Sequence, residues 1–581
     1  MKTFLAILMA ICMMATLLCV PALAAETEDK SVMHVLYGSM SKDFDDFEDG
    51  WNFAMEQANS GKEVHVTLLA DWTADEDGEF TDDFFNGAGF DYDAIYFADD
   101  VTITLDLGGH TIDRGLTTAE ANGEVMFIND GANVTIKNGT ITGGCSDNGA
   151  GGIHIEGANV ELIDLVFTGN RVHNDDGAAI QHVDGGELYM KNCRFVDNDC
   201  KNKGYDIYGT IYLDSLDKVR IEDCYFSSND NIDYGAGIHA SEIEDFEIKN
   251  STFENLNAGD RGGAIWIGDC KLYIYNCKFN NNSCGNYGGA IYSDTSELYV
   301  YDTEFKGNGS DWDGGAVYLT AGDGMESGMA PSYFYRCTFD GNRAGWDGGA
   351  IYACGSFMGL LTGATTYGCD FINNFAGGDG GAVCTALDCR FGFLSDKETG
   401  KVATMKNNFA GDLGGGFYQG KNAPFDFGGE IYASGNTSSA GNDDIRIRYG
   451  QACEILDSIT SPDGSIGIYY EDDDGGQLAE WIDESITVNS AAFFFNNGEF
   501  DLEFDQGYVK TMGYDGMMYT LDLGKMTAPV GSMFGEGSFT MIVALLALIA
   551  SGVCIFLTVY YNKKKAVPVA ANNAEETEGE E

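Results

Sequence analysis

A repeating unit constrains this chain of 581 residues more than any other feature. The motif Gly-Gly-Ala-Ile begins at Gly262, returns at Gly288 and returns as Gly-Gly-Ala-Val at Gly314, so successive copies start 26 residues apart. Sequence periods of about 20 to 50 residues are typical of solenoids, in which each repeat packs only on its neighbours. Short apolar alternations broken by Gly and Asn fill each unit and favour strands. We therefore expect each unit to form one coil of a parallel β-helix, an all-β fold.

Aligning the repeats places residues of one kind in columns. One column holds Phe and another, three residues later, holds Asn: Phe167, Phe195, Phe226, Phe253, Phe279, Phe305, Phe339 and Phe371, and Asn170, Asn198, Asn229, Asn282, Asn308, Asn342 and Asn374. Parallel strands stack about 4.8 Å apart, so like side chains on successive coils touch, and Asn at a left-handed turn can form an amide ladder. A third column mixes Cys with Ser251 and Thr303, which indicates a small inward side chain and free, buried thiols. Disulfides between neighbouring coils, Cys193 with Cys224 or Cys337 with Cys369, are the alternative.

The two ends of the chain differ from the repeats. Lys2, an apolar run and the small-residue exit Ala22-Leu23-Ala24 are typical of a secretory signal peptide. Near the other end, the stretch from Thr540 to Val559 carries no charge and is long enough to span a bilayer, and Lys563-Lys564-Lys565 follow it. We expect a single-pass membrane protein whose N-terminal region lies outside the cell, at the cell surface.

Between these ends the chain divides by pattern. Phe47, Trp51, Ala54, Met55 and Ala58 recur at helical spacing, so we expect a helix that caps the first coil and its open strand edge. The expected divisions are a signal peptide at 1–24, the cap helix and first strands at 25–100, parallel β-helix repeats at 101–450, degenerate coils or a small β module at 451–524, a flexible stalk at 525–538, a transmembrane helix at 539–561 and an acidic cytoplasmic tail at 562–581.

Charge limits the partners of the chain. Its 92 Asp and Glu residues outnumber its 32 Lys and Arg residues, which gives a formal net charge of −60 and excludes nucleic acid, because phosphates are repelled. Cations, neutral glycans and basic proteins remain. The sequence contains no phosphate-binding loop, zinc-protease motif or serine-hydrolase motif. We expect no required cofactor, with Ca²⁺ as the ion that acidic turns could bind.

The paired motif of Gly-Gly-Ala-Ile followed by Phe-x-x-Asn carries a resemblance. Over roughly Gly149 to Asn442 the repeat resembles that of polymorphic outer-membrane-protein and adhesin-like proteins. The resemblance implies a right-handed, single-stranded parallel β-helix of the pectate-lyase-like superfold. For function it implies only an adhesin-like surface role.

An outward position directly after the first apolar column holds many aromatic residues. It includes Trp266, Tyr292, Tyr318, Tyr352 and Tyr418, which would stack into a stripe along one face. Aromatic rings one coil apart could hold sugar rings by apolar stacking. The alternative interpretation is that aromatic residues simply favour strands and shield the sheet.

Aspartates recur at the turn that enters the same strand. Asp260, Asp313, Asp347 and Asp379 are the candidates for a Ca²⁺ site, because carboxylates from adjacent turns could converge on a hard cation. Solvated turn residues are the alternative, since Asp is favoured in turns.

Three coils are longer than the others, with extra residues near Ala321 to Met329, Gly355 to Thr362 and Leu394 to Lys401. We expect all three insertions between the first strand and the next, where loops that grow on one side of a solenoid often mark its working face. Neutral drift of surface loops is the alternative.

Three functions fit these observations. The first is an adhesin-like surface protein that binds a glycan or a neighbouring surface through the outward face of the solenoid. The second is a polysaccharide lyase or glycoside hydrolase on the same scaffold, although no recognisable acid/base set occurs and no residue is assigned a catalytic role. The third is a passive surface spacer.

Overall fold

The structure is a computed structural model. It describes residues 31–74, 94–200, 207–229, 231–321, 331–355, 363–386, 389–448 and 453–471, and beyond them residues 486 and 492 and strands β54 to β57. The expected signal peptide, transmembrane helix and cytoplasmic tail lie outside these residues. In the described part of the chain, no helix is long and apolar enough to cross a membrane.

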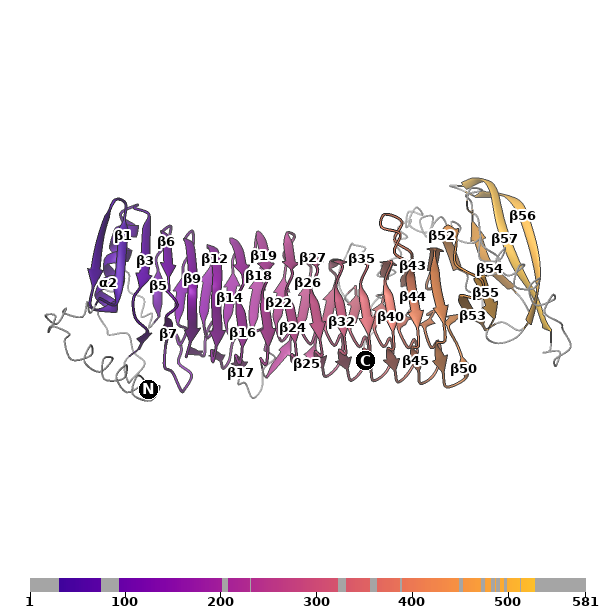
Figure 1. The fold of residues 1–581 in the computed structure, drawn as a ribbon, viewed down its shortest axis with the longest axis horizontal. Helices are drawn as coiled ribbons and strands as arrows, with labels where there is room; N and C mark the ends of the chain where they lie inside the picture. The colour runs from indigo at the N-terminus through magenta and orange to yellow at the C-terminus, as the bar shows by residue number, and fades with distance from the viewer. Residues whose placement is uncertain are drawn as a thin grey trace, which may run out of the picture.

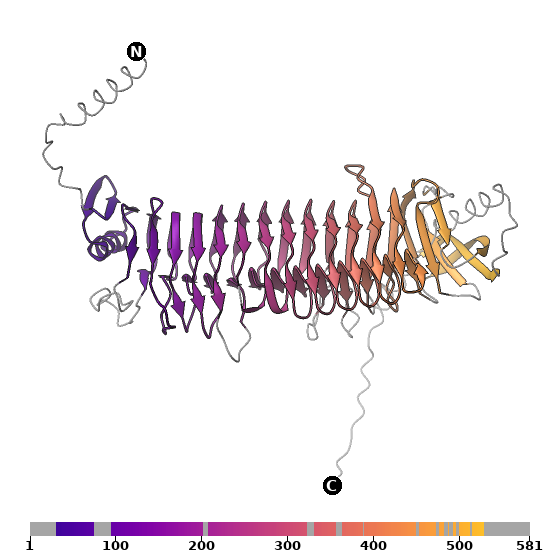
Figure 2. The ribbon, with the colours of Figure 1, turned by 60° about the horizontal axis from the view of Figure 1, so that its bottom comes forward.

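The chain forms a long right-handed parallel β-helix, as the repeat predicted (Figures 1 and 2). Each regular coil contains four strands that lie on four faces. The coil that begins at Ile265, for example, consists of β26 (Ile265–Gly268), β27 (Lys271–Tyr275), β28 (Lys278–Asn280) and the short β29 (Ser283–Cys284). Each strand pairs in parallel with its counterpart one coil later, such as Ile265 with Ile291 and Phe279 with Phe305.

Strands of the first face follow the glycine corner. They are β5 (Ile95–Phe97), β8 (Met126–Ile128), β11 (Ile153–Glu156), β14 (Ile180–Val183), β18 (Ile211–Asp214), β22 (Ile238–Ser241), β26, β30 (Ile291–Asp294), β34 (Val317–Thr320), β38 (Ile351–Cys354), β42 (Val383–Thr385), β46 (Phe417–Tyr418) and β51 (Ile445–Ile447).

The second face carries the longer strands of each coil. They are β3 (Val64–Leu68), β6 (Thr102–Asp106), β9 (Asn133–Thr142), β12 (Asn159–Thr168), β15 (Glu187–Lys191), β19 (Lys218–Glu222), β23 (Phe246–Lys249), β27, β31 (Glu297–Tyr301), β35 (Pro331–Tyr335), β39 (Gly363–Tyr367), β43 (Arg390–Leu394), β47 (Phe425–Gly429) and β52 (Cys453–Ile459). Strands β9 and β12 continue onto the third face.

The third face holds the phenylalanine column. Its other strands are β4 (Trp72–Thr73), β7 (Thr111–Asp113), β16 (Arg194–Val196), β20 (Tyr225–Ser227), β24 (Thr252–Glu254), β28, β32 (Glu304–Lys306), β36 (Thr338–Asp340), β40 (Asp370–Ile372), β44 (Ala403–Lys406) and β48 (Ile431–Ser434). Strand β53 (Ile466–Tyr470) pairs with β48 at Ile466 and with β51 of the first face from Ile468 to Tyr470.

Most strands of the fourth face contain two residues. They are β10 (Cys145–Ser146), β13 (Arg171–Val172), β17 (Asp199–Cys200), β21 (Ile232–Tyr234), β25 (Asn257–Arg261), β29, β33 (Gly309–Ser310), β37 (Arg343–Ala344), β41 (Phe375–Ala376), β45 (Phe409–Ala410) and β49 (Thr437–Ser438). Strand β50 (Gly441–Asn442) ends this sheet and pairs antiparallel with β49. A turn then leads to the glycine corner, where Gly262 has a φ of 64° that favours glycine.

Identical side chains stack through the interior. The eight phenylalanines from Phe167 to Phe371 form one stack with ring centroids 4.6 to 4.9 Å apart. Beside them Asn308 Nδ2 donates to Asn342 Oδ1 at 3.0 Å and to the carbonyl oxygen of Phe279 at 2.9 Å. The left-handed backbone conformation, which we expected at the ladder Asn, instead occurs at the residue before it, such as Asn281 with a φ of 53°. None of the thirteen cysteines in the described part of the solenoid forms a disulfide, and all except Cys354 are buried.

The first coil is capped by more than the expected helix. Helix α2 (Phe47–Asn59) buries the predicted apolar face, and the Asp46 side chain accepts a hydrogen bond from the amide of Asp49 at its N-terminus. Strands β1 (Met33–Tyr37) and β2 (Met40–Phe44) form an antiparallel hairpin, and β1 also pairs with β3. This hairpin was not predicted.

The other end of the solenoid also leaves the parallel pattern. Strand β52 pairs in parallel with β54 (Gly476–Trp481), and β53 pairs in parallel with β55 (Phe493–Phe495). Strand β57 (Tyr514–Thr527) then pairs antiparallel with both β54 and β56 (Glu499–Thr511). The expected stalk at 525–538 therefore begins inside a strand, and its remainder lies outside the described residues.

One predicted insertion is in a different place. The insertions after Ala321 and Gly355 do lie between the first and second strands of their coils. The insertion predicted at 394–401, however, begins at the last residue of β43 and lies in the connection to β44, so it follows the second strand. The three long segments do not share one corner of the solenoid.

Candidate ligand-binding site

The predicted aromatic stripe lies on the first face, and its rings stack on one another. The Trp266 and Tyr292 centroids are 6.2 Å apart, those of Tyr292 and Tyr318 are 5.2 Å apart, and those of Tyr318 and Tyr352 are 5.3 Å apart. Cys384 separates Tyr418 from this stack, because it occupies the intervening coil. Ring faces within the stack are therefore turned toward each other and not toward solvent.

Turn residues cover much of the stripe. Tyr292 is only 5% exposed, and the Tyr287 ring packs 4.7 Å from the Tyr318 ring. The Arg261 guanidinium lies over the Tyr292 ring, 5.2 Å from its centroid. Burial raises the pKa of Tyr292 and Tyr318 above the usual range, so both hydroxyls stay protonated. Most of the stripe consequently forms a seam between the first face and the turn before it.

Two tryptophans extend this seam into solvent. Trp312 and Trp346 stand on successive coils, stack 5.5 Å apart at an interplanar angle of 7°, and are 44% and 60% exposed. Trp312 also contacts Tyr287 edge-on at 6.0 Å, which joins the pair to the stripe. We call Trp312, Trp346, Tyr287, Tyr292, Tyr318 and Tyr352 the aromatic corner.

The stack ends in open space on one side. The amide of Trp346 donates to the carbonyl oxygen of Trp312, and the amide of Gly378 donates to that of Trp346, so Gly378 holds the same position one coil later. Because glycine has no side chain to cover the indole, one ring face of Trp346 is available. The next residue in this column, Asp412, is exposed.

The two tryptophans were missed in the sequence, although a signal was present. Each precedes Asp-Gly-Gly by one position, at Trp312-Asp313-Gly314-Gly315 and at Trp346-Asp347-Gly348-Gly349. The signal is that Trp recurs directly before the predicted aspartates Asp313 and Asp347, one position farther toward the turn.

Three of the aspartates predicted to bind Ca²⁺ support the turns of successive coils. Asp313 Oδ1 accepts the amide of Asp347 at 3.0 Å, and Asp347 Oδ1 accepts the amide of Asp379 at 2.7 Å. Asp260 is not in this column, because its counterparts are Asn286, Trp312 and Trp346. In the part of the chain that the structure describes, no group of three or more His, Cys, Asp or Glu could hold a metal ion.

The supporting aspartates lie in partly desolvated positions. Burial raises the pKa of both Asp313 and Asp379 to about 6, and it raises the pKa of Asp347 as well. Asp313 and Asp347 directly follow Trp312 and Trp346, and Asp379 follows Gly378 one coil later. A ligand on the aromatic corner would thus lie beside carboxyl groups that change charge near neutral pH.

A shallow groove adjoins the corner on the fourth face. Its volume is about 600 Å³, and its lining includes Gly285, Gly309, Ser310, Asp311 and Arg343. Ser310 is buried, and its hydroxyl has no hydrogen-bond partner among the described residues. The Arg343 guanidinium lies 4.1 Å from the centroid of the Phe375 ring. Asp311 and Gly345 of the groove immediately precede Trp312 and Trp346, so the groove and the corner are continuous.

Comparisons with known proteins address the fold. No curated protein and no solved structure matches the chain. The family described as "Right handed beta helix region" matches residues 89–231 and 207–389, which together make up more than half of the 581 residues. The chain belongs to this family of right-handed β-helix proteins.

Proposed function

We propose that this protein is a cell-surface solenoid that binds an extended glycan at the aromatic corner. One observation carries the proposal, the exposed Trp312–Trp346 stack with an open indole face above Gly378. Sugar rings present apolar faces that stack on indole rings, and their hydroxyl groups need polar partners close by. The groove of the fourth face offers such partners in Asp311 and Arg343, which are both exposed.

The location on the surface is also part of the proposal. A signal peptide at 1–24 and a membrane helix at 539–561 would leave the solenoid outside the cell, where it could contact a glycan. Membrane fractionation of the full chain and of a chain that ends at residue 538 tests this. The proposal requires the full chain to remain in the membrane after carbonate washing and the shortened chain to be released.

Binding is tested with the full chain in detergent on a glycan array, followed by titration of the glycans that bind. Replacing Trp312 and Trp346 together by Ala should weaken binding by about tenfold or more, because two stacking surfaces are lost. Tyr225→Ala is the control, since Tyr225 is a partly exposed aromatic residue on the third face. Equal binding by all three proteins would contradict the proposed site.

Polysaccharide cleavage is the second candidate. The observation that favours it is the raised pKa of Asp313 and Asp379 beside the aromatic corner, because a general acid needs a proton near neutral pH. Assays for new reducing ends and for unsaturated products, with and without Ca²⁺, distinguish cleavage from binding. Activity that survives Asp313→Asn and Asp379→Asn would exclude these two residues.

A further inference from the structure

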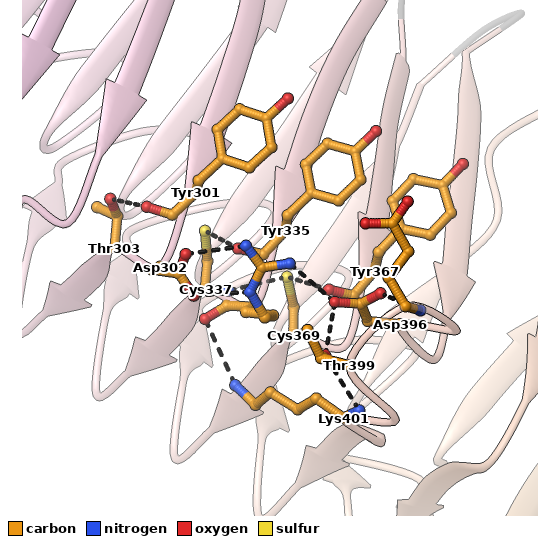
Figure 3. A network of polar contacts seen from close by, with 12 residues as sticks. Tyr301, Asp302, Thr303, Tyr335, Cys337, Tyr367, Cys369, Asp396, Thr399 and Lys401 are labelled. Carbon is orange, nitrogen blue, oxygen red and sulfur yellow. Dashed lines mark hydrogen bonds and ion pairs between the residues drawn. The ribbon is translucent and has the colours of Figure 1, made fainter.

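The second face carries two tyrosine ladders that the glycan proposal does not use. Seven partly exposed tyrosines stack on strands β27, β31, β35 and β39, with centroids 4.7 to 5.4 Å apart: Tyr273, Tyr299 and Tyr333 in one ladder and Tyr275, Tyr301, Tyr335 and Tyr367 in the other. Figure 3 shows Tyr301, Tyr335 and Tyr367 in a row, with their hydroxyl groups on the same side. This surface is distinct from the aromatic corner, which lies on the first face and the turn before it.

Charge on the second face is balanced, unlike that of the chain. The second-face strands from β6 to β43 hold seven basic residues (Lys137, Lys191, Lys218, Arg220, Lys249, Lys271 and Arg390) and six acidic residues (Asp106, Glu161, Glu187, Glu222, Glu247 and Glu297). Strands β9 and β12 are counted only to residues 137 and 163, where they leave this face. Many of them pair across coils, as Lys218 does with Glu187 and Lys271 with Glu297, both at 2.9 Å. The acidic excess behind the net charge of −60 therefore lies elsewhere.

A charged cluster supports the edge of the tyrosine ladders. Arg336 Nε donates to Asp302 Oδ1 at 2.7 Å, and Arg336 Nη1 donates to Asp396 Oδ2 at 2.8 Å (Figure 3). Lys401 Nζ lies 3.2 Å from Asp370 Oδ2. These contacts join four successive coils and hold the turn between β43 and β44 against the solenoid. The two bases and three acids of the cluster leave one negative charge at this edge.

The N-terminal half of the same face is hollowed. A groove of about 480 Å³ crosses β6, β9, β12, β15 and β19, and its lining includes Thr104, Asn133, Thr135, Glu161 and Arg220. One half of the second face is thus a polar groove, and the other half is a surface of tyrosine rings. Strand β23 lies midway between them, with five strands on each side from β6 to β43.

We propose that the second face pairs with the second face of another copy of this chain. A twofold axis along β23 makes the two solenoids antiparallel, so that the groove strands of each copy meet the tyrosine strands of the other. The register of the parallel strands then sets Arg220 opposite Tyr273, Lys191 opposite Tyr301 and Lys137 opposite Tyr367 of the other copy. Each of these pairs a cation with an aromatic ring.

Area and charge favour a second copy as the occupant. Eleven strands about 4.8 Å apart, each about five residues of 3.3 Å, give roughly 800 Å² for each copy, the size of a standard protein interface. Two chains that each carry −60 repel one another through most of their surfaces. The balanced second face permits close approach. The same register sets Glu247 and Lys249 opposite their own copies, Lys218 opposite Lys271 and Glu187 opposite Glu297. Each of these groups is ion-paired within its own chain, so the contacts bring neutral pairs together.

Cross-linking of the full chain tests the twofold axis. Glu247→Cys places a thiol on β23 at the axis. Because facing sheets pack about 10 Å apart, which is too far for a disulfide, a bismaleimide that spans about 10 Å should join two copies through this thiol. Glu254→Cys is the matched control, because Glu254 lies on β24 in the same coil but on the third face. The unsubstituted chain controls for its own thiols. A covalent dimer with Glu247→Cys alone supports the proposal, and its absence, or equal dimer with Glu254→Cys, overturns it.

Sedimentation equilibrium of the full chain in detergent tests the ladders. Replacing Tyr301 and Tyr335 together by Glu should raise the dimer dissociation constant by about 100-fold, because two central aromatic contacts are lost and charge is buried. Lys306→Glu makes the same change of two charge units at an exposed residue on the third face, and circular dichroism checks that each variant is folded. A chain that is monomeric at 100 μM, or a dimer equally affected by both variants, overturns the proposal.

Discussion

Two aromatic stacks in this molecule have similar geometry and opposite surroundings. The phenylalanine stack runs through eight coils in the interior, and each of its rings is completely buried. The Trp312–Trp346 stack contains two rings, lies in solvent and ends at a glycine. Stacking along the solenoid follows from the spacing of parallel strands in both places. Burial separates the two roles, since a covered ring contributes to stability and an open ring face can bind a ligand.

The largest expected effect is on the interior stack. Phe279→Ala removes a fully buried ring between Phe253 and Phe305, so it should lower the free energy of unfolding by about 3 to 5 kcal/mol. Chemical denaturation followed by far-ultraviolet circular dichroism measures the change. A loss below about 1 kcal/mol would show that the stack does not stabilise the coils.

A smaller effect is expected in the asparagine ladder next to that stack. Asn342→Ala removes the donor to the Phe305 carbonyl oxygen and the acceptor of the Asn308 amide, both buried. The loss should be about 1 to 3 kcal/mol, because buried polar groups are left without partners. Asn342→Leu is the informative comparison, since Leu256 holds the same position in its own coil. If both variants unfold at the same denaturant concentration as the natural chain, the ladder does not contribute to stability.

Acidity should strengthen the turns at the aromatic corner. The pKa of Asp313 and Asp379 is raised by burial from an ordinary value of 3.8 to about 6. Between these two pKa values the unfolded chain loses protons that the folded chain keeps. The stabilisation that these two carboxyls contribute is therefore complete below about pH 4 and is lost as the pH rises toward 6. Other carboxyls, such as Asp302 with a pKa lowered by Arg336, lose stabilising charge only at lower pH.

Thermal unfolding between pH 4.5 and pH 7.5 measures this dependence. The midpoint should fall by several degrees over the interval, because a destabilisation of about 1 kcal/mol shifts the midpoint of a large domain by about 2 to 4 °C. Replacing Asp313 and Asp379 together by Asn should flatten the profile. A midpoint that rises over the same interval would contradict the desolvation of these carboxyls.

The smallest expected effect is on the exposed stack. Trp346→Ala should change the free energy of unfolding by no more than about 0.5 kcal/mol, since the side chain is 60% exposed. Tyr292→Ala, in the covered part of the aromatic corner, should cost more because Tyr292 is only 5% exposed. Paired denaturation curves compare the two variants. If Trp346→Ala and Tyr292→Ala lowered the free energy of unfolding equally, burial would not distinguish the covered tyrosines from the exposed tryptophan pair.

Much of the fold could be predicted because the side chains that point into the solenoid are the same in successive coils. A stacked interior demands the same residue on every coil, so Phe279, Asn282 and their counterparts appear as columns in the sequence. The antiparallel hairpin of β1 and β2 could not be found in this way, since it occurs once and depends on pairing with β3. The family match confirms the right-handed β-helix but not a particular function.

The candidate site was harder to predict because outward residues vary from coil to coil. The stripe was located correctly on the first face, but the sequence does not show that Tyr287 and Arg261 cover it. Asp260 was grouped with Asp313 although the strand register places it one column away. Exposure depends on what the turns place over each residue, and a single sequence carries little information about that.

The central claim is that the open Trp346 face binds sugar, and tryptophan fluorescence tests it most directly. A glycan selected from the array is titrated into the full chain and into the variant with Trp312 and Trp346 both replaced by Ala. The claim predicts a saturable change in the emission of the natural chain that is lost in the variant, with both proteins equally stable. Saturable binding of equal affinity by the variant would contradict it.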